Sequence, residues 1–223
     1  MALHRRLSPL EYAVGSGVIV VAVFAAATAS YLSVQQPILT DSRVLVYPIV
    51  WSTAGVVAAV WVGRTVRVRP RPWLGVAVGV GYTLALCWLS GIVGATTGTQ
   101  TSQLVLSLPG WGPIFLYDNG LVSLSIVPFK LVAYLSLGYI VAILVSAAGS
   151  ARTAVLGLAS CVSCAAPLLL AVAGLFGGTQ ATAMVASTGY DLATIVLVAT
   201  FGLLVRAAQK TTAACEIPNA EGQ

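Results

Sequence analysis

The sequence predicts an all-α fold, a polytopic membrane protein built as a bundle of about six transmembrane helices with both termini cytoplasmic. Three observations lead to this prediction. Charged residues make up 8% of the 223 residues, against roughly 25% in soluble domains. Apolar residues form segments long enough to cross a bilayer, and basic residues lie between alternate segments. A soluble surface cannot be built from this composition, whereas lipid tails favour it.

Six apolar segments follow one another, each near the ~20 residues that cross ~30 Å of hydrocarbon at ~1.5 Å per residue. They are residues 12–32, 44–63, 73–95, 121–145, 153–176 and 184–205. Lipid offers the backbone no hydrogen-bond partners, and no segment shows the alternation of a barrel strand, so we predict helices. Residues 1–210 then form one transmembrane helical domain, and residues 211–223 a disordered cytoplasmic tail.

The first segment has two interpretations. The stretch "HRR" followed by "VIVVAVFAAATAS" is similar to a secretory signal peptide with a small-residue cleavage site. The apolar stretch is longer than the ~7 to 15 residues of such a peptide's apolar region, which favours a retained membrane anchor.

The basic residues predict the orientation. Two of the eleven, Arg43 and Lys130, fall on one side of the predicted bundle. The other nine fall on the opposite side: Arg5, Arg6, Arg64, Arg67, Arg69, Arg71, Arg152, Arg206 and Lys210. Basic loops stay in the cytoplasm, so both termini are predicted to be cytoplasmic.

The longest external loop, residues 96–120, is rich in turn formers, including Pro109, Pro113 and Gly120. We expect it to lie on the membrane surface or to dip back into the bundle. Trp111 and Tyr117 are then expected to be interface anchors, with a ligand platform as the less favoured alternative.

Small residues four positions apart recur, as in Gly75 with Gly79 and Gly174 with Gly178. Such spacing is typical of close helix packing rather than of a functional site.

Two cysteines in "SCVSCAAP" are the main chemical clue. Cys161 and Cys164 are predicted to share one face of the fifth helix, ~13 Å from its cytoplasmic end, and Pro167 interrupts the helix one turn further on. Three interpretations stay open. The cysteines pack as small apolar residues, they cycle between dithiol and disulfide, or they bind a soft cation such as Cu(I).

Three charges are expected at the outer face: Asp118, Lys130 and Asp191. Charges in a membrane are costly and usually paired or functional. Lys130 can extend to the interface, and Asp191 suits the positive start of the sixth helix, so structural roles are favoured. We expect Lys130 and Asp191 to lie near each other.

No catalytic triad, P-loop, HExxH or GxGxxG occurs, and the single histidine, His4, lies in the basic N-terminal arm. This excludes an ATPase or a soluble-type hydrolase and favours a role without catalysis. The expected partners are the lipid bilayer and other membrane proteins. Nucleic acid is not expected, because the net charge of +5 is explained by topology.

The stretches "YPIVW", "PGWGP", "VPFK", "SCVSCAAP" and "YDLAT" together resemble a haloarchaeal multi-pass membrane family of unknown function, over nearly the whole chain except the tail. The resemblance implies a cell-membrane location and an archaeal host, and it implies no activity. The cysteine pattern also looks like the thiol helices of membrane disulfide carriers and mercury carriers. This chain lacks the adjacent cysteines of the mercury carriers and has one dithiol where disulfide carriers use cysteines on two helices.

The sequence thus leads to a functional hypothesis, a non-enzymatic membrane component that handles thiols or a soft metal, such as copper, through Cys161 and Cys164. The alternative is a permease-like or scaffolding subunit of a transporter or respiratory complex, in which these cysteines only pack.

Overall fold

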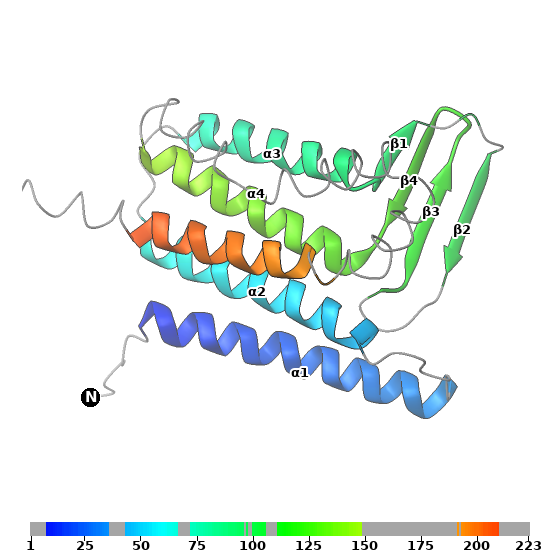
Figure 1. The fold of residues 1–223 in the computed structure, drawn as a ribbon, viewed down its shortest axis with the longest axis horizontal. Coiled ribbons are helices and arrows are strands. Elements are labelled where there is room, and N and C mark those ends of the chain that lie inside the picture. The colour runs from blue at the N-terminus through cyan, green and yellow to red at the C-terminus, as the bar shows by residue number, and fades with distance from the viewer. Residues whose placement is uncertain are drawn as a thin grey trace, which may run out of the picture.

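The structure, a computed structural model, describes residues 8–35, 43–66, 72–95, 97, 100–105, 111–148, 191 and 193–209. Five helices lie side by side (Figure 1): α1 (Pro9–Gln35), α2 (Arg43–Thr65), α3 (Pro72–Leu89), α4 (Pro128–Ala148) and the C-terminal helix (Ala193–Gln209). Between α3 and α4 the chain forms a four-stranded antiparallel sheet. The described residues are therefore mostly helical, with one small sheet.

The first four helices alternate in direction, and the C-terminal helix runs in the same direction as α4 (Figure 1). The starts of α1 and α3, and the ends of α2, α4 and the C-terminal helix, lie at one end of the bundle, and the sheet lies at the other (Figure 1). We call the first the basic end, because the last turn of α2 contains Arg64 and the C-terminal helix carries Arg206. We call the second the sheet end. The predicted segment 153–176, with Cys161, Cys164 and Pro167, lies outside the described residues.

The first helix begins at a reciprocal cap. The Ser8 N–H donates to Glu11 Oε2 at 2.6 Å, and the Glu11 N–H donates to Ser8 Oγ at 3.3 Å. Pro9 occupies the first helical position, where its missing N–H costs nothing. α1 therefore starts three residues before the predicted segment 12–32.

The centre of the bundle is α4, which packs against both α2 and α3. Its side chains Phe129, Ala133 and Ile140 are fully buried. Gly55 of α2 lies where three helices meet, because a Cβ there would lie 3.1 Å from Ser136 Oγ and 3.4 Å from Phe201 Cζ of the C-terminal helix. α1 packs against α2 and is the least buried helix.

Close packing of α3 on α4 depends on glycine, as predicted for Gly75 and Gly79. A Cβ on Gly79 would lie 2.5 Å from the Gly138 carbonyl oxygen and 2.8 Å from Ala142 Cβ. A Cβ on Gly75 would collide with Ser146 and the Ala142 carbonyl. Gly174 and Gly178 lie outside the described residues.

The outward faces of the helices are apolar. Three helices are long and apolar enough to cross a membrane, over Pro9–Tyr31, Leu45–Thr65 and Pro128–Ala147, and two shorter apolar helices are Trp73–Leu89 and Ala193–Gln209. On α3, the exposed large side chains are Trp73 at 68%, Trp88 at 60%, and the apolar Leu74, Val76, Val80, Leu84 and Leu89. Three spanning helices are thus supported among the described residues, against the six predicted for the whole chain.

The sheet corrects the all-α prediction. Its strands are β1 (Val93–Ala95), β2 (Thr101–Val105), β3 (Ile114–Asp118) and β4 (Val122–Ile126), in the order β1-β4-β3-β2. The predicted loop 96–120 therefore contains β2 and β3, and the predicted helical segment 121–145 starts with a strand. The alternation "VSLSI" of β4 is a sequence pattern typical of a strand, and in the structure Val122 is exposed while the next four residues are half-buried.

α3 also ends earlier than the predicted segment 73–95. The Ile92 N–H donates to the Cys87 carbonyl at 2.9 Å and the Gly91 N–H to the Trp88 carbonyl at 3.1 Å, with Gly91 at a φ of 74°. This is the Schellman arrangement, which closes a helix through a left-handed glycine. Ile92 is buried behind it, and β1 begins at once.

Candidate functional site at the sheet end

Aromatic side chains from three parts of the chain meet at the sheet end. The ring of Phe129, at the start of α4, lies 5.4 Å from that of Trp51 in α2 and 4.9 Å from that of Trp111, just before β3, in edge-on geometry. Tyr134 lies 6.4 Å from Trp51. Edge-on aromatic pairs add stability beyond their buried area. Trp111, predicted as an interface anchor, therefore joins the loop to the core.

Two polar contacts lie beside this aromatic cluster and connect α2 with the C-terminal helix. The Tyr47 hydroxyl donates to Asp191 Oδ1 at 2.6 Å, and the Trp51 Nε1–H donates to Thr194 Oγ1 at 2.8 Å. Tyr47 and Trp51 are four positions apart on α2 and therefore share one face of that helix. Asp191 and Thr194 are three positions apart and likewise share one face of the C-terminal helix. The two bonds therefore fix the C-terminal helix in one register on α2.

Asp191 is half-buried and itself helical, and it lies two positions before Ala193 on the N-terminal side of the C-terminal helix, where a negative charge is favoured by the helix dipole. Its carboxylate combines this position with the Tyr47 hydrogen bond. Lys130 is also half-buried and lies in the first turn of α4, next to the buried Phe129. The start of α4 and the start of the described C-terminal helix both lie toward the sheet end of the bundle (Figure 1), and the pairing of Lys130 with Asp191 stays a prediction.

The third predicted outer-face charge, Asp118, lies in the hairpin between β3 and β4. Its Oδ1 accepts the Gly120 N–H at 2.8 Å, and Asn119 Oδ1 accepts the Leu121 and Val122 N–H groups at 3.0 and 2.8 Å. Gly120 has a φ of 84°, which favours glycine. The Asp118 carboxylate therefore supports a turn.

The residues that the structure describes contain no pair of cysteines and no cluster of metal ligands. Cys87 is a free, buried thiol of α3 within the apolar core. No group of three His, Cys, Asp or Glu residues that could hold a metal ion occurs in the described ranges. Cys161, Cys164 and Pro167 lie outside these ranges, so the structure does not test the redox or copper hypothesis.

Sequence reasoning missed both contacts, that of Tyr47 with Asp191 and that of Trp51 with Thr194. Tyr47 and Trp51 lie in the quoted stretch "YPIVW", and Thr194 lies in "YDLAT". Each stretch places polar atoms one helical turn apart in an apolar segment, which is the pattern of a polar contact between helices. That pattern indicates such contacts, while the identity of the partner helix depends on the fold.

The fold and this site define a mostly helical protein with apolar outward faces and a polar, aromatic cluster beside a small sheet. The chain belongs to a family described as a family of unknown function (DUF7546), whose model matches residues 2–211. A search of curated proteins and a search of solved structures find no match. The family covers nearly the whole chain, and it brings no activity to this protein.

Proposed function

We propose that the protein is a multi-pass integral membrane protein of the cell membrane, with six transmembrane helices and the basic end in the cytoplasm. The observation that carries this proposal is the outward face of α3. Its exposed tryptophans, Trp73 and Trp88, flank exposed Leu and Val side chains. Tryptophans at both edges of an apolar belt are typical of helices that cross a membrane. Soluble monomers rarely expose large contiguous apolar surfaces.

The ends of the described helices support the proposed number of crossings. α4 ends at the basic end, and the C-terminal helix begins at the sheet end (Figure 1). A crossing by the predicted segment 153–176 would connect these two ends. The haloarchaeal host implied by the sequence resemblance is part of the same proposal.

Membrane integration is tested by fractionating cells that express the full chain. Washing the membranes with alkaline carbonate releases peripheral proteins and leaves integral ones. We expect the protein to stay in the washed membranes and to be released by detergent alone. Its release by carbonate would contradict the proposal.

For the activity, we propose that Cys161 and Cys164 handle thiols or a soft metal such as Cu(I) without catalysing a reaction of their own. The support is their spacing, which places two thiols on one helix face beside Pro167. Thiolates are ligands that Cu(I) prefers, and two thiols can close a disulfide where the helix is interrupted.

The test is thiol titration and copper content of the purified protein, with and without reductant. We expect Cys161→Ser and Cys164→Ser each to abolish the copper or redox response, because one thiol can neither close the disulfide nor bridge the metal. The matched control is Cys87→Ser, a buried thiol on another helix, which should keep the response. Thiols that stay reduced in oxidant and bind no copper would contradict the proposal.

A second candidate function is a permease-like or scaffolding subunit, and Asp191 favours it. A half-buried carboxylate bonded to Tyr47 at 2.6 Å is the kind of ionisable group that membrane proteins keep for transport or assembly. Co-purification with another membrane protein that is lost in Asp191→Asn and kept in Cys161→Ser would favour this candidate over the first.

A further inference from the structure

The basic end carries an arginine held in an unusual position. Arg64, in the last turn of α2, is exposed, and its guanidinium carbon lies 4.0 Å from the centre of the Tyr12 ring of α1. A guanidinium over an aromatic face is attracted by the ring and keeps the N–H groups at its edge available. Arg64 is therefore held in place without losing its hydrogen-bond donors.

The helix segment that carries Tyr12 packs closely on α2. The neighbouring Ala13 is buried at 1% exposure, and a Cβ on Gly17 would lie 2.8 Å from Val57 Cγ2, so the first turns of α1 press closely on α2. Tyr12 as a whole remains 38% exposed. The pair thus forms a rigid, positively charged edge at the junction of α1 and α2.

No carboxylate neutralises this edge among the residues that the structure describes. Glu11, next to Tyr12, accepts the Ser8 N–H at 2.6 Å in the helix cap. Because a guanidinium binds oxyanions through two parallel hydrogen bonds, Arg64 is suited to a phosphate group.

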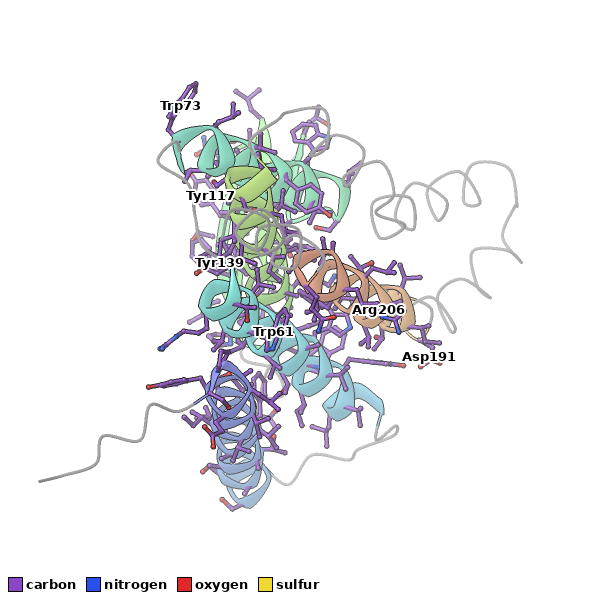
Figure 2. All side chains as sticks on the ribbon, turned by 90° about the vertical axis from the view of Figure 1, so that its left-hand side faces the viewer. Trp61, Trp73, Tyr117, Tyr139, Asp191 and Arg206 are labelled. Atoms are coloured by element: carbon purple, nitrogen blue, oxygen red, sulfur yellow. The ribbon has the colours of Figure 1, made fainter. Side chains whose placement is uncertain are left out.

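The position of Arg64 and Tyr12 along the axis of the bundle indicates which molecule would carry that phosphate. Trp73, exposed at 68%, starts α3 at the same end, and Trp61 lies one turn before Arg64 (Figure 2). Tryptophans mark the level of the lipid headgroups. A phosphate at this level belongs to a lipid of the cytoplasmic leaflet, whose negative charge attracts basic segments beside membrane helices.

We propose that Arg64, stacked on Tyr12, is a binding site for the phosphate headgroup of an anionic lipid. This inference rests on the proposed membrane location. The stacked guanidinium binds the headgroup, and the lipid in turn joins α1 to α2, the neighbour on which α1 packs.

The experiment measures the midpoint of thermal unfolding of the full chain in detergent. It compares added phosphatidylglycerol, phosphatidylcholine and inorganic phosphate at equal concentration. We expect phosphatidylglycerol to raise the midpoint more than the other two additives. Arg64→Gln should lose most of this rise and weaken phosphatidylglycerol binding about tenfold or more, the usual effect of losing a charge-assisted hydrogen bond.

Arg206→Gln is the matched control, because Arg206 is also exposed on the basic half of the molecule but stacks on no ring in the described part of the chain. It should keep the rise. Arg64→Lys preserves the charge without the planar fork, so it gives a second measurement if Arg64→Gln does not fold, and it should bind the lipid more weakly than the natural protein.

An unchanged rise in Arg64→Gln, or in Arg64→Lys if the former does not fold, would overturn the site. If Arg206→Gln loses as much of the rise as Arg64→Gln, the lipid is attracted by the basic end as a whole, and the specific site at Arg64 is refuted. An equal rise with inorganic phosphate would overturn the lipid source. Membrane location is measured separately, by the carbonate wash. If the protein stays in the washed membranes but shows no lipid effect at Arg64, only the lipid site is refuted.

Discussion

The Tyr47 hydroxyl donates a hydrogen bond of 2.6 Å to Asp191 Oδ1, across 144 positions of the sequence. Together with the bond from Trp51 to Thr194, it joins the start of α2 to the start of the C-terminal helix. Both bonds lie at the end of the bundle that carries the sheet (Figure 1). They connect two helices that lie far apart in the sequence, so their loss should be measurable.

Tyr47→Phe removes the donor to Asp191 and keeps the ring. We expect it to lower the free energy of unfolding by about 1 to 2 kcal/mol, because a hydrogen bond to a charged group is lost and the carboxylate stays half-buried. Tyr117→Phe is the control, since Tyr117 is 43% exposed in β3 and stacks on Phe115. It should change the stability by less than about 0.5 kcal/mol. Equal effects in a denaturant titration would contradict the prediction.

Lys130 and Asp191 are predicted to pair at the sheet end. If they do, Lys130→Met or Asp191→Asn alone should destabilise the protein more than the double variant, because each single change strands a charge. A double-mutant cycle of unfolding free energies measures this coupling. Additive losses would argue against the pair.

Gly79→Ala tests the contact between α3 and α4. The added methyl group would lie 2.5 Å from the Gly138 carbonyl oxygen, and we expect a loss of about 1 to 3 kcal/mol from overpacking. Gly81→Ala, on the same helix, is the matched control, because no atom lies within 4 Å of its Cβ. It should leave the stability unchanged or raise it by up to about 1 kcal/mol. A thermal unfolding series that shows the same shift for both would refute the close contact.

Orientation is tested by single cysteines in a background without Cys87, Cys161, Cys164 and Cys215. Val68→Cys, in the basic loop after α2, should resist an impermeant thiol reagent added outside intact cells. Gln100→Cys, which directly precedes β2 and is exposed, should react. The opposite labelling pattern would reverse the proposed topology.

Hydropathy alone predicted α1 and α2, because the long apolar runs that form these helices are visible in the local sequence. α2 matches the predicted segment 44–63 within two residues at each end, and α1 differs by three at each end. The glycine spacing of Gly75 and Gly79 also predicted a close helix contact, because a missing side chain is visible in the sequence whatever its partner.

Hydropathy could not separate β4 from α4. A short apolar run is equally compatible with a strand and with a helix, and the run from Leu121 continues without a charge to Lys130. The local indications of a strand were present, namely the "DNG" turn and the alternation of "VSLSI". They were outweighed by the length of the apolar segment, which a membrane helix requires.

The sequence by itself determined the apolar composition of the chain, the two long N-terminal helices and the turn residue Gly120, because these depend on each residue and its near neighbours. The tertiary structure decided that β1 pairs with β4, with Val93 opposite Leu124, and that Tyr47 meets Asp191. Such contacts join residues from tens to more than a hundred positions apart, and many apolar segments could supply an equivalent partner. Which segments contact each other therefore depends on the packing of the whole bundle, in which the central helix α4 contacts both α2 and α3.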